Sequence, residues 1–130
     1  MSLLQALPLL AYAGCIFAIL RIAIQDGPVS GRAWAVPAGL GVAFLIFSLV
    51  TVFEEGLMMF WYNHTVNWTG NQVWFDLLLA TSIAFYLMAP RARAVGMALL
   101  PWAVAVVATA CIALLPMLAR LLWLERRAAA

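Results

Sequence analysis

The spacing of charged residues along the chain constrains its fold more than any other feature. Four long apolar segments, at residues 3–24, 34–56, 73–90 and 95–118, contain few ionisable side chains. Each is close to or above the roughly 20 residues that a helix needs to cross a bilayer. Backbone groups inside hydrocarbon must bond to one another, and a helix achieves this within one segment. The sequence therefore predicts an all-α integral membrane protein with four transmembrane helices in an antiparallel bundle.

Composition favours the same fold class. Of the 130 residues, 68% are hydrophobic and 9% are charged, whereas a soluble domain carries about 25% charged residues. The four segments fill most of the chain, so we expect a single transmembrane domain over residues 1–130. Residues 119–130 alternate apolar and charged side chains in a helix-compatible pattern, which predicts an interfacial helical tail.

The connectors between the segments differ in length and chemistry. Gln25 to Arg32 contains Asp-Gly-Pro and Ser-Gly, which is typical of a turn, and Pro90 precedes the short Arg91–Arg93 connector. Residues 57–72 predict one longer loop, with Asn71 as the N-cap of the third helix.

Arginine placement indicates an orientation. The first and third connectors carry Arg21, Arg32, Arg91 and Arg93, and the second carries no Lys or Arg. Positive connectors face the cytoplasm, so we expect the Glu54–Asp76 region on the periplasmic side of a bacterial inner membrane. With four crossings both termini would also lie outside. The arginines at the C-terminus argue against that placement.

Nucleic acid, metal and cofactor binding find no support in the residue patterns. The seven arginines lie singly or in pairs, and there is no lysine, so no basic patch forms. Cys15 and Cys111 fall within apolar segments, and no Cys/His spacing typical of a metal site occurs. We therefore predict no metal, no cofactor and no nucleic-acid partner.

Three of the five carboxylates lie on one polar stretch, at Glu54, Glu55 and Asp76. Because the second and third predicted helices are antiparallel neighbours, these carboxylates would meet in the same leaflet. Ionisable groups near a bilayer are costly unless they are paired, hydrated or used. A proton shared among them would supply both an acid and a base, which makes them the candidate catalytic residues.

Aromatic side chains and the single histidine accompany these carboxylates. They are Trp61, Tyr62, His64, Trp68 and Trp74, and we predict that they line a ligand site whose ring faces could stabilise a cation. The same residue types also form the aromatic belt at a membrane interface. Under that alternative the glutamates are solvated, Asp76 begins a helix and His64 is an ordinary loop residue.

Two short motifs resemble families of isoprenoid enzymes. Val73 to Leu79, the Arg91–Arg93 connector, and Leu115-Pro116 ahead of Glu125-Arg126-Arg127 together resemble a family of small, uncharacterised bacterial multi-pass membrane proteins. That family is distantly related to integral-membrane terpene cyclases, and the resemblance covers about the last 60 residues. It implies a role for Asp76 at the family's Asp-Leu-Leu position.

The second motif is Glu54-Glu55 followed by Phe60. It resembles the paired-glutamate motif of small-subunit membrane carotenoid cyclases, with Val52-Phe53 where those enzymes carry a proline. Both resemblances imply a hydrophobic isoprenoid ligand.

Three functions remain open at this point. The first is an accessory or scaffold subunit, or a lipid-binding module, without a complete catalytic set. The second is an isoprenoid (terpene or carotenoid) cyclase-like enzyme that uses carboxylate acid–base chemistry. The third is a small transporter, although ionisable groups near mid-membrane are missing. Four short helices enclose little space, so we expect a homo-oligomer or a larger membrane complex in contact with membrane lipid.

Overall fold

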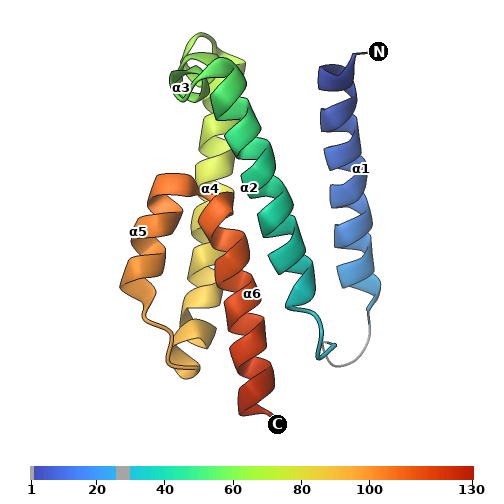
Figure 1. Cartoon of the computed structure of the whole chain (residues 1–130), viewed down its shortest axis with the longest axis vertical. Helices are drawn as coiled ribbons and strands as arrows, with labels where there is room; N and C mark the ends of the chain where they lie inside the picture. Colours follow the sequence, from blue (N-terminus) through green and yellow to red (C-terminus); the bar gives the residue numbers. More distant parts are fainter. Residues whose placement is uncertain (1, 26–29) are drawn as a thin grey trace.

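The computed structural model describes residues 2–25 and 30–130. These residues form six helices and no strand (Figure 1), which confirms the all-α class. The helices are α1 (Leu3–Ile24), α2 (Ala35–Glu55), α3 (Met58–Thr65), α4 (Trp68–Ala94), α5 (Leu99–Thr109) and α6 (Cys111–Ala128). The turn predicted across Gln25 to Arg32 lies partly outside the described residues.

Three of the described helices are long and apolar enough to cross a membrane. They are α1, α2 and α4, with 22, 21 and 27 residues, which correspond to about 33, 31 and 40 Å. The first two coincide with the predicted segments 3–24 and 34–56. Ser2 caps α1, because its hydroxyl accepts from the Gln5 backbone amide while the Gln5 side chain accepts from the Ser2 amide.

The fourth predicted crossing, over residues 95–118, is not one helix. The chain leaves helical geometry at Ala110, whose φ is 47°, and α6 turns back alongside α5 (Figure 1). With 11 residues, α5 is about 16 Å long and too short to cross a bilayer. The described residues therefore do not confirm a bundle of four crossing helices.

Packing explains why the segment folds back on itself. In the hairpin, Ala113, Met117 and Leu121 of α6 are buried together with Met88 of α4 and Val106 of α5. The Ala110 amide still donates to the Val106 carbonyl at 2.7 Å, which closes the last turn of α5. Tertiary contacts of this kind outweigh the modest local preference for continuing a helix.

Residues 119–128 belong to this packed hairpin as part of α6. The helix predicted for residues 119–130 does form, yet it is not a separate tail, because Leu121 is fully buried. At the end of α6, Glu125 accepts two hydrogen bonds from Arg91 of α4, at 2.8 and 2.7 Å. The C-terminal segment therefore joins the core.

The predicted loop over residues 57–72 contains more helix than expected. It holds α3 and the first turns of α4, with Asn67 and not Asn71 as the N-cap. The Asn67 side-chain oxygen accepts from the Gly70 amide at 2.7 Å. An Asn in extended geometry three residues before an exposed amide is a strong cap, and this one starts α4 five residues earlier than predicted.

The helices pack unequally around this core. α2 packs mainly against α6, and at Gly41 an added Cβ would come within 3.4 Å of both Leu115 and Pro116. The second and third predicted helices were expected to form an antiparallel pair, but α2 packs against α6 and α4 packs against α3, α5 and α6. α1 stands apart in Figure 1 and has no buried residue.

Candidate functional site

The predicted site lies at one end of the molecule, which we call the polar end (residues 53–76). It comprises the last turn of α2, the short helix α3 and the first turns of α4, at the top of Figure 1. Glu54, Glu55 and Asp76 are all exposed there. Among the described residues, no hydrogen bond or ion pair joins any of them to another side chain.

Asp76 lines a shallow hollow of about 330 Å³ on the surface of α4. The other lining residues are Gln72, Val73, Phe75 and Leu79. Glu54 and Glu55 do not line this hollow. An acid and a base that act on one substrate atom must both lie within hydrogen-bond reach of it. The hollow offers one carboxylate, so the predicted three-carboxylate set is not gathered around a common cavity.

Two of the predicted lining residues, His64 and Trp74, contact each other. The His64 ring centroid lies 5.3 Å from that of Trp74, and its Nδ1 lies 2.6 Å from the Phe60 carbonyl oxygen. A carbonyl only accepts, so Nδ1 carries the proton in this contact. The geometry docks α3 onto α4.

The remaining aromatic side chains at the polar end face outward. Trp61, Tyr62 and Trp68 are exposed to 56, 54 and 92%. Rings that project in this way from helix ends match the interfacial belt that was the alternative interpretation. They enclose no cavity at this end.

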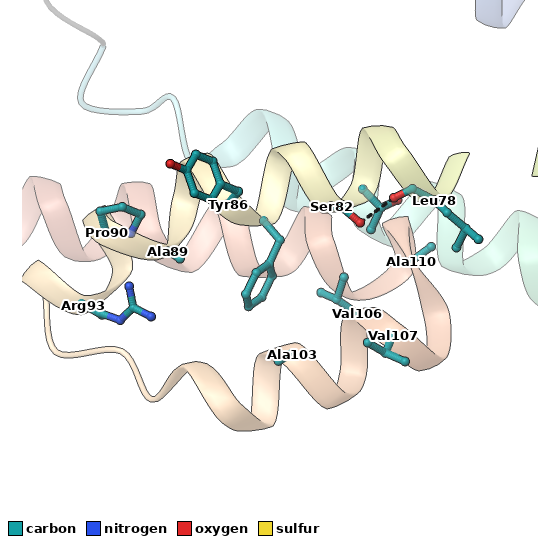
Figure 2. A pocket seen from close by; sticks show the side chains of 12 residues that line it. Leu78, Ser82, Tyr86, Ala89, Pro90, Arg93, Ala103, Val106, Val107 and Ala110 are labelled. Atoms are coloured by element: carbon teal, nitrogen blue, oxygen red, sulfur yellow. Dashed lines mark hydrogen bonds between the residues drawn. The ribbon is translucent and has the colours of Figure 1, made fainter. Parts of the chain in front are cut away.

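A larger cavity lies elsewhere, between α4 and α5, with a volume of about 640 Å³. We call it the α4–α5 groove, and Figure 2 shows it from close by. Its lining residues are Leu78, Thr81, Ser82, Phe85, Tyr86, Ala89, Pro90 and Arg93 from α4, and Ala103, Val106, Val107 and Ala110 from α5 and the following turn. Ligand pockets in proteins typically measure about 300–1,000 Å³.

The walls of the groove are chemically simple. Most lining side chains are apolar, and the Ser82 hydroxyl donates to the Leu78 carbonyl at 2.8 Å (Figure 2), which satisfies it within the helix. Arg93 is the one charged residue among those that line the groove. A cavity of this kind can hold an apolar chain and offers no acid–base pair.

Arg93 lies at one end of the groove, beyond Ala89 and Pro90, with Leu78 and Ala110 at the other end (Figure 2). Arg91, two positions earlier, is held by Glu125 through two hydrogen bonds. Within residues 2–25 and 30–130, Arg93 has no such carboxylate partner. The two arginines therefore differ in role, although the sequence places them in one motif.

The groove was not predicted from the sequence, although the residues of α4 that line it follow a helical pattern. Thr81, Phe85, Ala89 and Arg93 recur every four residues and so share one helix face. That stripe alone does not indicate a cavity, because the opposite wall requires α5 to run beside α4. The predicted antiparallel helix over 95–118 would also run beside α4, but it would not turn at Ala110, where the groove ends.

Comparison with known proteins found no matching family model, characterised protein or solved structure. The resemblance to relatives of terpene cyclases therefore stays a prediction.

Proposed function

We propose that the protein is a small multi-pass membrane protein that binds the apolar chain of a membrane lipid in the α4–α5 groove and has no catalytic activity of its own. One observation carries this proposal, namely a cavity of about 640 Å³ whose walls are apolar apart from a few groups. In this role it would act as a lipid-binding module or as an accessory subunit of a membrane complex.

The distribution of arginines supports a membrane placement with three crossings. α1 ends, α2 begins, and α4 and α6 end at the lower end in Figure 1, which we call the arginine end. Arg21, Arg91, Arg93, Arg126 and Arg127 lie in the last turns of these helices. An added Cβ at Gly31 would lie 3.4 Å from Arg126 Nε, so the first connector adjoins the C-terminus.

This arrangement removes the conflict that four crossings created. Because α5 and α6 form a hairpin, the C-terminal arginines return to the end that carries the first and third connectors. The positive-inside rule then favours the arginine end in the cytoplasm and the polar end outside, in a bacterial inner membrane. α5 and α6 would enter the membrane from the cytoplasmic side and return to it.

A lipid chain could reach the groove sideways from the bilayer. Val107 and Tyr86, at its rims, are exposed to 89 and 76%. Among the described residues, only α4, α5 and the turn at Ala110 contribute lining residues. Side chains of this kind are stable against hydrocarbon, and an apolar chain that fills the groove replaces bilayer contacts with closer packing.

The experiment compares Ala103→Trp, which fills the groove, with Val104→Trp on the next position of α5. Val104 does not line the groove and is 63% exposed. Each purified protein is incubated with a phospholipid that carries a photoactivatable acyl chain, and crosslinked peptides are mapped by mass spectrometry. We expect wild type and Val104→Trp to crosslink on α4 and α5, and Ala103→Trp to lose most of that crosslinking. Equal crosslinking in all three proteins would disprove chain binding in the groove.

The cyclase alternative depends on Asp76, the one carboxylate that lines a hollow at the polar end. Turnover of a prenyl substrate by the purified protein, lost in Asp76→Asn while the fold is retained, would favour it. Under our proposal neither protein converts such a substrate. A small transporter has less support, because the groove holds no charged group away from its Arg93 end.

An oligomeric or accessory role is part of the proposal. α1 is a 22-residue apolar helix with no buried residue, so most of its surface is available to lipid or to another helix. The mass of the detergent-solubilised particle tests this, since a monomer would count against a homo-oligomer.

A further inference from the structure

The α4–α5 groove has a direction as well as a volume. We propose that it selects an anionic phospholipid of the cytoplasmic leaflet, with the headgroup phosphate at Arg93 and an acyl chain directed toward Ala110. This inference rests on the proposed function, because it requires that the groove holds a lipid chain, and it adds which lipid and in which orientation.

The first argument is the length of the groove wall. α5 has 11 residues and so measures about 16 Å, which is half of the roughly 30 Å hydrocarbon core of a bilayer. The groove begins near Arg93 at the arginine end and closes at Ala110, where the chain turns into α6 (Figure 2). Its depth therefore matches one leaflet and not the whole membrane.

The second argument is the order of polar and apolar groups along the groove. A lipid of the cytoplasmic leaflet places its headgroup at the interface and its chain ends at the midplane. Arg93, in the last turn of α4, stands at the interface end, and Leu78, Val106 and Ala110 stand toward the middle. A lipid of the opposite leaflet would place its chain ends against the guanidinium.

The third argument is charge. The Arg91 guanidinium is already matched by the Glu125 carboxylate, with N–O distances of 2.8 and 2.7 Å. Arg93 has no carboxylate partner in the described part of the chain, and Arg126 and Arg127 carry further positive charge at the same end. A planar guanidinium binds phosphate through two parallel hydrogen bonds. A neutral isoprenoid would fill the groove and leave Arg93 unmatched, and free phosphate would leave the apolar walls unfilled.

The experiment measures which lipid remains bound. Wild-type protein in mild detergent is equilibrated with an equimolar mixture of phosphatidylglycerol and phosphatidylcholine that have identical acyl chains, and bound lipid is counted by native mass spectrometry. Both lipids carry the phosphate that Arg93 would bind, but phosphatidylcholine adds a quaternary ammonium that the arginines at this end repel. We therefore expect wild type to retain the anionic lipid in about tenfold excess. Arg93→Gln should bring that ratio close to one while total lipid bound stays nearly constant.

Two matched variants separate recognition from stability. Arg91→Gln removes an arginine from the same turn of α4 and should keep the preference, because that side chain is held by Glu125. Arg93→Lys should keep a reduced preference for the anionic lipid, because the lysine ammonium keeps the positive charge but cannot form the two parallel hydrogen bonds of a guanidinium. An excess of inorganic phosphate should leave the bound lipid in place.

The outcomes that overturn this inference differ from those that overturn the proposed function. Equal retention of the two lipids by wild type, which needs no variant, contradicts the anionic selection and leaves chain binding intact. An equal loss of preference in Arg91→Gln and Arg93→Gln shows a general charge effect and also overturns it. Unchanged crosslinking in Ala103→Trp rejects the lipid groove itself.

Discussion

The polar end and the α4–α5 groove are both built on α4, and they differ in nearly every physical respect. Asp76 lies in the first third of this helix and Arg93 in its last turn. The polar end contains three carboxylates, a histidine and three tryptophans, but only one carboxylate, Asp76, lines its hollow of about 330 Å³. The groove has one charged lining residue and a volume of about 640 Å³.

The comparison shows that residue types capable of acid–base chemistry do not form a binding site unless the fold also encloses a ligand. At the polar end the side chains that could perform chemistry project outward, and water or lipid headgroups can solvate them. In the groove two helices face each other, and a ligand would contact side chains on both sides. Binding requires enclosure because many weak contacts must act on one molecule.

The largest effect should separate the packed half of the molecule from the polar end. Met117 is fully buried between α4, α5 and α6, whereas Met58 of α3 is 59% exposed. Met117→Ala should lower the unfolding free energy by about 1–3 kcal/mol through lost packing contacts, since lipid and core are equally apolar. Met58→Ala should change it by less than about 0.5 kcal/mol. Unfolding in SDS, followed by circular dichroism, measures the unfolding free energy of both variants. Equal losses of unfolding free energy would contradict the difference between the packed half and the polar end.

A second substitution tests how firmly the polar end is held. A Cβ added at Gly70 would lie 2.7 Å from the Asn63 carbonyl oxygen and 3.1 Å from His64 Cα. Because backbone atoms cannot step aside cheaply, Gly70→Ala should displace α3 from α4 at a cost of about 1–2 kcal/mol. Faster hydrogen exchange in α3 would report this. Gly39→Ala, where nothing lies within 4 Å of the added atom, is the control.

A substitution in the turn at Ala110, which closes the groove, should have a smaller effect on stability and should stabilise the protein. Ala110 has a φ of 47° and a ψ of −116°, a combination that L-residues rarely adopt and that costs them about 1–3 kcal/mol. Gly has no such penalty but loses more backbone entropy on folding, so Ala110→Gly should stabilise the protein by about 0.5–1 kcal/mol. Ala108→Gly, in the last turn of α5, should destabilise it by up to about 0.8 kcal/mol. The same sign for both would mean that the chain does not turn at Ala110.

The smallest effect concerns the two arginines near the groove. The Arg91 and Glu125 side chains are 49 and 32% exposed, so Arg91→Gln should cost only about 0.2–1 kcal/mol. A double-mutant cycle with Glu125→Gln isolates this pair energy. Arg93→Gln should leave stability unchanged. A larger loss from Arg93→Gln would indicate a structural role and weaken its assignment to the headgroup.

Local patterns were sufficient for α1 and α2. Their apolar runs are bounded by Ser2 and by the glutamates before Gly56, and the observed bounds lie within one residue of those predicted. Patterns failed for residues 95–118, because alanine at position 110 is not a residue typical of turns. Hydropathy gives the length of an apolar segment but does not show whether the segment folds back on itself. They also failed at the start of α4, where the predicted cap was Asn71 and the structure has Asn67, next to the end of α3.

The sequence by itself determined the helical class, the membrane-length apolar segments and the absence of Lys and Arg from residues 53–76. These properties follow from composition and spacing, which act on each segment independently. Only the tertiary structure decided that α5 and α6 form a hairpin, and that Arg91 is paired with Glu125 while Arg93 lines the α4–α5 groove. It also decided that the predicted catalytic carboxylates do not line a common cavity. Those features depend on which helix faces pack against each other. Close packing between residues far apart along the chain determines this.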